Sequence, residues 1–457
     1  MQNSLREIVM PGRRFAMKAL HLGLPIIIQN FIMFALNMMD IILLQGKGDT
    51  AVAAVSIANQ ANQVINLLIF GTCSGCSIFV AQCRGSRDFI SMRKTVALAL
   101  SILGSVTLCS ALLMSIFPST VMRIMTNVPA LVDTGARYLR IASFSYILSG
   151  MSLVFSTLLR CNEKTKLPLV ASIIALSLNT GLNYLLIYGK WGFPEMGAVG
   201  AAVATVISRM VEFGIILYFV YGGDEQEIKP FFKDFIGITR QFCGRFFKIA
   251  APVMCNEIIW GLGMTIYSTI YGRMGESTVA AMSVASIMEQ TFAVVAIGCG
   301  HITTIMVGQQ LGHEKFERAK QYAKTLSLWA VLLGLATTLL MIAVAPFFVR
   351  VIFSNLSQET MHIATGLIIM FACYMPVRAF NYTNIVGTLR SGGDSLYAAI
   401  FDVGPMYLFS IPAGFILGLW LRWPPITVIA IMYGEEFIKG ICGFLRMIQY
   451  KWVRKIG

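Results

Sequence analysis

Charged side chains are scarce in this sequence. Only 13% of its residues are Asp, Glu, Lys or Arg, whereas a soluble globular domain carries roughly 25%. Apolar residue types make up 56% of the chain, so a water-facing surface would have to be largely apolar. The shortage of charge therefore excludes a soluble globular protein and favours lipid as the solvent of much of the chain.

Long polar stretches are also rare. Between them the chain is apolar over windows of about 20 residues, which is the length that a bilayer-spanning helix needs. Twelve windows qualify: about 20–43, 53–81, 96–117, 134–158, 167–188, 198–222, 249–271, 280–307, 324–348, 363–387, 396–420 and 426–448. They lack the alternation of β-barrel strands, and helices satisfy their own backbone hydrogen bonds in hydrocarbon. We expect an all-α integral membrane protein with twelve transmembrane helices.

The first window lacks the small-residue cleavage site that follows a signal peptide, and it is too long to be one. We therefore expect it to be retained as a spanning helix. With twelve spans, both termini lie on one side of the membrane. Loops and helix ends on that side hold 25 of the 36 Lys and Arg residues, Arg390 among them, and those on the opposite side hold eight. The positive-inside rule places both termini in the cytoplasm.

The net charge of +14 is explained by this topology and by anionic lipid head groups, so we expect no nucleic-acid partner. The localisation predicted is the inner (cytoplasmic) cell membrane, with the lipid bilayer as the surrounding partner.

Motifs for metal or covalent chemistry are largely missing. The sequence has no HExxH helix and no paired-aspartate motif, so a polytopic membrane enzyme is the weaker alternative. Cys73 and Cys76 form a CxxC, but the pair lies within an apolar window and has no second pair. Buried inert thiols are favoured over a metal or redox site. The acid in GlyGlyAsp at 392–394 is expected in a cytoplasmic loop. We predict no enzyme, no cofactor and no resident metal.

The chain repeats itself. Shifting residues 25–85 by 227 positions places them on 252–312 without a gap, with fourteen identities that include Pro25/Pro252 and Gly48/Gly275. Six spans in each half make the two repeats parallel, related by an axis along the membrane normal. We predict an N-lobe (1–222), a cytoplasmic linker (223–247) and a C-lobe (248–457). This arrangement suits a transporter with a site between two lobes.

A few polar residues fall inside the first six windows, where ionisable groups are costly and therefore candidates for function. Asp40 lies deep in the first window, with no basic residue within a helical turn. Asn179 and Asn183 share one helix face at i, i+4, and Thr205 and Ser208 lie in the sixth window. Their oxygens suit a small cation. Ordinary hydrogen bonding between helices is the alternative.

The second half has its own buried charges. Glu257, Glu289, Arg378 and Asp402 lie within predicted spans. Arg378 could pair with one of these acids, which would make both structural. Two further sets, Arg209 with Glu212 and Glu435 with Lys439, have the spacing of local ion pairs on a helix.

Several motifs, in order across both repeats, resemble the multidrug and toxic compound extrusion (MATE) family of bacterial type. They are ProIleIleIleGln at 25–29, Asp40, GlyAspThrAlaValAlaAla at 48–54, GlyThrCysSerGly at 71–75, ValAlaGln and ArgGly within 80–85, GlyAlaValGlyAlaAlaValAlaThr at 197–205 and LeuArgSerGlyGlyAsp at 389–394. The resemblance covers essentially the whole chain.

The resemblance implies a two-lobe, monomeric antiporter that expels small organic cations against inward Na⁺ or H⁺. The family's N-lobe cation site maps onto Asp40, Asn179, Asn183 and Thr205, where Asn183 replaces the usual acid. One charge fewer weakens the case for tight Na⁺ binding. Apart from Na⁺ at this site, no metal is implied.

Other branches of the family use an acid in helix 7, which Glu257 matches. Their additional helix 10 acid is missing, Arg378 stands in that helix, and Asp402 could compensate. We therefore expect an organic-cation exporter with alternating access, driven by Na⁺ or H⁺. A lipid-linked oligosaccharide flippase of the same wider superfamily is the alternative. The small number of arginines in the middle of the spans disfavours it.

Overall fold

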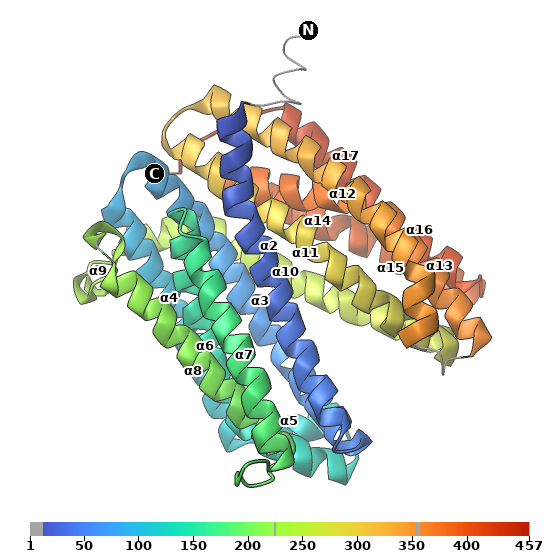
Figure 1. The fold of residues 1–457 in the computed structure, drawn as a ribbon. Helices are drawn as coiled ribbons and strands as arrows, with labels where there is room; N and C mark the ends of the chain where they lie inside the picture. Colours follow the sequence, from blue (N-terminus) through green and yellow to red (C-terminus); the bar gives the residue numbers. More distant parts are fainter. Residues whose placement is uncertain (1–11, 224, 353–356, 457) are drawn as a thin grey trace. The chain divides into compact units, whose positions relative to one another are not determined.

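The computed structural model describes residues 12–223, 225–352 and 357–456, and its regular elements are all helical within these ranges (Figure 1). The long helices are α2 (Arg13–Gln45), α3 (Asp49–Ser86), α4 (Phe89–Ile116), α6 (Pro129–Cys161), α7 (Lys166–Tyr188), α8 (Ala198–Gly222), α10 (Arg240–Met274), α11 (Glu276–Gly312), α12 (Phe316–Ile352) and α13 (Gln358–Asn381).

Shorter helices and π-helical turns complete the described part of the chain. They are α5 (Pro118–Met125), η1 (Gln226–Ile228), α9 (Phe232–Ile236), η2 (Tyr382–Leu389), α14 (Ser395–Pro405), η3 (Met406–Ser410), α15 (Ile411–Ala413), η4 (Gly414–Trp420), α16 (Pro425–Tyr433) and α17 (Glu435–Ile448). The π-helix η2 continues α13 without a break, and the elements from α14 to η4 form one continuous helical run.

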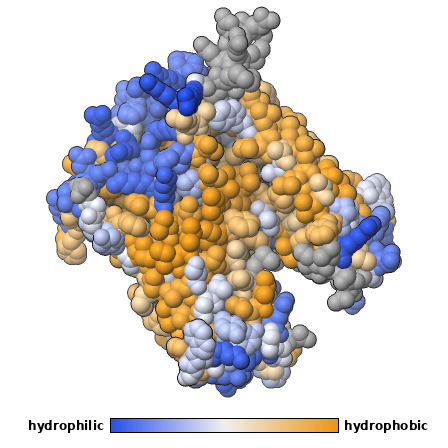
Figure 2. All heavy atoms as spheres, in the orientation of Figure 1, coloured by the Kyte–Doolittle hydropathy of each residue, from blue (hydrophilic) through white to orange (hydrophobic). Residues whose placement is uncertain are grey.

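Eleven helical segments in the described ranges are long and apolar enough to cross a membrane. The twelfth predicted window, 426–448, is occupied by α16 and α17, which meet at Gly434. Figure 2 shows hydrophobic side chains over the middles of the helices and hydrophilic ones at their ends. Lipid-facing helices need this pattern, because charged side chains are tolerated only where they reach head groups or water. The predicted all-α membrane fold is confirmed.

By its internal contacts the chain divides into two compact units. Unit 2 is Ile28–Phe247, and unit 1 combines the chain up to Ile27 with the residues from Lys248 onward. The first boundary falls inside α2, so Pro25 belongs to unit 1 and Asp40 to unit 2. The division into an N-lobe (1–222), a linker (223–247) and a C-lobe (248–457) that work as functional parts remains a prediction.

The two units are built alike. In unit 2, α6 packs against α3, α4 and α8, and α7 packs against α8. In unit 1, α13 packs against α11, α12 and α17. The helix that is fourth in each predicted repeat is thus the central one in both units.

Two glycines explain part of the repeat in physical terms. Gly48 precedes α3 with φ 92° and ψ 166°, and Gly275 precedes α11 with φ 125° and ψ 163°. Residues with a Cβ rarely adopt this backbone conformation, whereas glycine does so without penalty. The glycine recurs at the same place because both turns enter the next spanning helix in the same way.

The loop between η2 and α14 is covered rather than exposed. Asp394 accepts hydrogen bonds from Arg446 at 2.6 Å and from Arg454 at 3.2 Å, and it is 6% exposed. Trp452, which is fully buried, packs its backbone against Gly392. The expected loop is therefore present, but the C-terminal segment closes over it.

Replacing Gly392 with alanine is expected to lower stability. A Cβ at this position would overlap the backbone carbonyl of Trp452, which no side-chain rotation can relieve. Overpacking of this kind costs about 1–3 kcal/mol. Thermal unfolding in detergent should show a lower midpoint for G392A and an unchanged one for G404A, because a Cβ at Gly404 on α14 meets nothing within 4 Å. Equal midpoints would contradict the described packing of the C-terminal segment.

Candidate functional site

The four polar residues predicted for the first half lie together within unit 2. Asp40 comes from α2, Asn179 and Asn183 from α7, and Thr205 from α8. Asn183 Nδ2 donates to Asp40 Oδ1 at 2.5 Å and to Asn179 Oδ1 at 3.0 Å. Thr205 Oγ1 lies 3.5 Å from Asp40 Oδ2, and Asn179 Nδ2 donates to Thr205 and Ser208 hydroxyls at 3.4 Å. The predicted grouping is therefore present, and its role stays a prediction.

The chemistry of this group suits a small cation or a proton. Asp40 is 7% exposed, and both asparagines are fully buried. Asn183 Oδ1 has no hydrogen-bond partner among the described residues. The two ends of an asparagine amide are assigned from the hydrogen-bond network, so turning this amide would offer an oxygen beside Asp40 to a cation. Carboxylate, amide and hydroxyl oxygens are the ligands that hard cations prefer.

A second polar chain extends from this group within unit 2. Arg209 and Glu212 form the predicted local ion pair at 2.7 Å. Glu212 also accepts from Ser172 Oγ at 2.8 Å, Ser172 from Gln29 at 3.1 Å, and Gln29 from Arg160 at 2.7 Å. A pair predicted to be local is thus one end of a buried network that spans several helices.

No basic residue was predicted near Asp40, because none lies within a helical turn of it on α2. In the structure Arg209 acts electrostatically on the Asp40 carboxylate. Arg209 follows Thr205 by four residues on α8, so both occupy one helix face. That spacing places Arg209 beside Thr205, and the contact of Thr205 with Asp40 across two helices brings it near the carboxylate.

The buried charges of the second half form a cluster within unit 1. Arg378 on α13 pairs with Glu289 on α11, as predicted, and lies 3.9 Å from Glu436. Asn381 Nδ2 donates to the Glu436 carboxylate at 2.6 Å. Glu435, next to Glu436 in the chain, pairs with Lys439 at 3.1 Å. The prediction of a local Glu435–Lys439 pair is confirmed.

Arg390 joins this cluster. It was counted among the loops and helix ends of the expected cytoplasmic side, and in the structure its side chain is buried, with 1% exposed. Its guanidinium lies 3.1 Å from Glu257 and 3.6 Å from Asp402, and Lys439 lies 3.7 Å from Asp402. The helix continues past η2, so Arg390 is itself helical and lies within reach of α10 and α14 instead of in an open loop.

Taken together, the unit 1 cluster has five acids and three bases. The acids are Glu257, Glu289, Asp402, Glu435 and Glu436, and the bases are Arg378, Arg390 and Lys439. The predicted residues Glu257, Glu289, Arg378 and Asp402 all belong to it. Glu436 and Arg390 were missed.

No group of three His, Cys, Asp or Glu side chains in the described ranges is arranged to hold a metal ion. The ten cysteines all lie in the described ranges, and none of them forms a disulfide there. Cys73 and Cys76 are buried, whereas Cys109 and Cys255 are exposed on their helices.

Comparisons with known proteins agree with this architecture. The family model MatE matches residues 25–185 and again 252–416, and the two matches start 227 residues apart, as the internal repeat does. The chain is 22% identical to the uncharacterized transporter YisQ of Bacillus subtilis (strain 168) over 94% of each chain. It is 25% identical to the multidrug resistance protein NorM of Photobacterium profundum, over 90% of each.

Solved structures share the fold. An outward-facing multidrug resistance MATE family transporter of the MOP superfamily superposes with a TM-score of 0.85 at 19% identity, covering 95% of this chain and 96% of the other. The eukaryotic MATE transporter AtDTX14 gives 0.83 at 15% identity, with 97% of each chain covered. With both halves matched by the family model and the same fold seen throughout, this chain is a multi-pass membrane protein that belongs to the MATE family of transporters.

Proposed function

We propose that this MATE transporter is a secondary-active exporter of small organic cations, driven by inward H⁺ or Na⁺. The observation that carries the proposal is the Asp40 carboxylate, buried among the neutral side chains of Asn179, Asn183 and Thr205. A buried carboxylate held chiefly by neutral groups can gain or lose a cation without breaking a direct ion pair. The multidrug resistance relative named above supports efflux of drug-like compounds.

In this proposal the ion and the substrate prefer different conformations. A proton or Na⁺ on Asp40 removes its negative charge, which weakens its attraction for Asn183 and for the nearby Arg209. Coupling requires only that the two ligands favour different states. The helix α2 carries Pro25 as well as Asp40, and a proline inside a helix favours a bend. A change of bend in α2 is the proposed link between ion binding and substrate release.

The coupling ion follows from the charge of the site. Asp40 is the one carboxylate among the four grouped residues, since Asn183 contributes an amide. A single carboxylate favours H⁺, because tight Na⁺ binding gains from each added negative ligand. We further propose that both termini are cytoplasmic, that the two repeats act as lobes with alternating access, and that the working unit is a monomer in the cell membrane.

Reconstituted transport tests this proposal. Purified protein in liposomes, loaded with a fluorescent organic cation, is given a pH gradient or a Na⁺ gradient separately. We expect the pH gradient to accelerate efflux, and a Na⁺ gradient at equal pH to act weakly or not at all. Acceleration by Na⁺ alone would overturn the assignment of H⁺. If neither gradient moved the cation while the protein remained folded, organic-cation antiport would be wrong.

A further inference from the structure

The short helix α9 (Phe232–Ile236), in the connection between α8 and α10, has its apolar side turned away from the protein. Phe232 and Ile236 are four residues apart and therefore share one face of the helix, and they are 80% and 73% exposed. Asp234 lies between them in the chain and on the opposite face, where it is 3% exposed. A helix on a water-facing surface shows the reverse arrangement, with its charged side outward.

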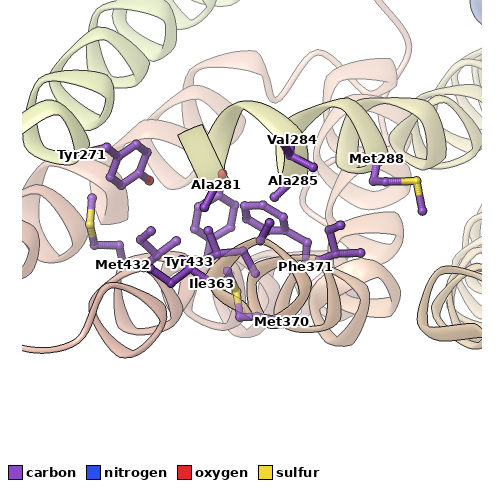
Figure 3. Packing of buried hydrophobic residues seen from close by; sticks show 14 of the residues in the cluster. Tyr271, Ala281, Val284, Ala285, Met288, Ile363, Met370, Phe371, Met432 and Tyr433 are labelled. Atoms are coloured by element: carbon purple, nitrogen blue, oxygen red, sulfur yellow. The ribbon is translucent and has the colours of Figure 1, made fainter. Parts of the chain in front are cut away.

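The core of unit 1 shows how this protein buries an aromatic side chain that serves packing. There Phe371 is 1% exposed, and its ring centroid lies 4.9 Å from that of Tyr433 (Figure 3). Phe232 and Ile236 are exposed instead, although burial of apolar surface is the main favourable term in folding. Their exposure is explained if an apolar phase outside the protein covers them.

Ion pairs hold the segment that contains α9 against other helices of unit 2. Asp234 pairs with Arg93 in the second turn of α4 at 3.3 Å, and Arg93 also donates to the Glu227 carbonyl at 3.1 Å. Lys164, in the turn between α6 and α7, pairs with Glu225 at 3.2 Å. Figure 1 shows α9 beside α4, against which it packs. The protein itself therefore fixes which face of α9 points outward.

The level of α9 along these helices is that of a membrane surface. The helices α4 and α8 have 28 and 25 residues, whereas about 20 cross the hydrocarbon, so their end turns extend toward the head groups. Tyr221, in the last turn of α8, donates to the Pro230 carbonyl at 2.8 Å, shortly before α9 begins. Tyr221 and Tyr218 are both exposed, and tyrosine is enriched where a membrane meets water. These contacts indicate that α9 lies at that boundary.

The basic residues beside α9 have no acid to neutralise them. Lys233 is exposed on α9, and its Nζ lies 5.7 Å from the ring centroid of Phe231. Lys94 on α4 lies next to the residue that follows α9, since its Nζ would be 3.6 Å from a Cβ at Gly237. Neither lysine has an ion pair among the residues that the structure describes. Of the acids described between α8 and α10, two are already paired and Glu227 remains, so the local charge suits an anionic surface.

We propose that α9 is a membrane-surface anchor. Phe232 and Ile236 enter the boundary between the head groups and the acyl chains of the bilayer, and Lys94 and Lys233 bind the head groups of anionic phospholipids beside them. Lipid is the occupant because the exposed apolar surface of the spanning helices continues to this level, as Ile90 in the first turn of α4 shows. An apolar face flanked by lysines is the pattern of helices that lie in a membrane interface.

Two quenchers of tryptophan fluorescence test the position of α9. Full-length F232W is placed in phosphatidylcholine nanodiscs, and the emission of the wild type, which has 6 tryptophans, is subtracted. Bromines on the lipid chains quench an indole in the bilayer, and iodide quenches an indole in water. We expect the added indole to be quenched most by bromines close to the head groups and to be protected from iodide.

The matched control is L339W, because Leu339 is exposed near the middle of the spanning helix α12. Its added indole should be quenched most by bromines deep in the chains, which calibrates the depth. Quenching of F232W by iodide, without quenching by brominated lipid, would overturn the anchor. Phe232 is exposed, so the substitution leaves the packing of the protein unchanged.

Brominated phosphatidylglycerol, compared with phosphatidylcholine brominated at the same position, tests the role of the lysines. At equal mole fractions the anionic lipid should quench F232W about twofold more strongly or better, because each cation at the surface attracts it. The ratio should fall to one in F232W/K94Q/K233Q and persist in F232W/K190Q, since Lys190 lies in the connection between α7 and α8. A ratio of one in F232W would overturn the head-group site, and an unchanged ratio in the double lysine variant would overturn Lys94 and Lys233 as its ligands. Because no readout involves transport, these results do not depend on the proposed antiport.

Discussion

Replacing Asp40 with asparagine is expected to abolish the acceleration of cation efflux by an imposed ion gradient. Asparagine keeps the size of the side chain and its capacity to bond Asn183, but it cannot bind a proton or carry a negative charge. A coupling free energy of about 1–3 kcal/mol corresponds to roughly 5–150-fold acceleration, and D40N should reduce this factor to one. The measurement is efflux of a fluorescent cation from proteoliposomes with and without the gradient.

The control removes an exposed carboxylate. Glu195 is in the connection between α7 and α8 and pairs with Lys47 at 2.6 Å. The hydrogen bond from Lys47 lowers the pKa of Glu195, so this acid is ionised at neutral pH and E195Q removes a real charge. Efflux by E195Q should respond to the gradient as the wild type does. Gradient-driven efflux by folded D40N at the wild-type rate would rule out Asp40 as the coupling residue.

Features that depend on long stretches of sequence could be predicted well. Each of the twelve apolar windows is covered by helix, because a run of about 20 apolar residues has few alternatives in a bilayer. The internal repeat could also be recognised in the sequence, because Gly48 and Gly275 both adopt a backbone conformation that favours glycine. The grouping of Asp40, Asn179, Asn183 and Thr205 was proposed from a family resemblance, and spacing on α7 alone linked only the two asparagines.

Features that depend on contacts between helices could not be predicted from spacing. Arg390 lies next to a Gly-rich turn, which made a loop the natural expectation, and its partners Glu257 and Asp402 are distant in the chain. The proximity of Arg209 to Asp40 likewise requires the packing of α2 against α8.

Removing the charge of Arg390 is expected to destabilise the protein strongly. Its side chain is 1% exposed and serves both Glu257 and Asp402. Asp402 retains Lys439 as a partner at 3.7 Å and Asn256 as a donor at 2.8 Å, so the R390M variant leaves Glu257 as the acid without a base. Breaking a buried ion pair by removing one partner costs about 3–5 kcal/mol, because an uncompensated charge stays behind. The midpoint of thermal unfolding in detergent measures the loss.

The double variant R390M/E257Q separates the lost attraction from the charge left behind. If the uncompensated Glu257 carboxylate causes most of the destabilisation, neutralising it should recover most of the midpoint, since replacing both members of a buried pair is often nearly neutral. A surface pair gives the contrast: K320A breaks the exposed contact with Glu317 and should cost at most about 1 kcal/mol. A double variant no more stable than R390M would mean that Arg390 acts through its packing and hydrogen bonds, and that the charge balance of the cluster matters less than its geometry.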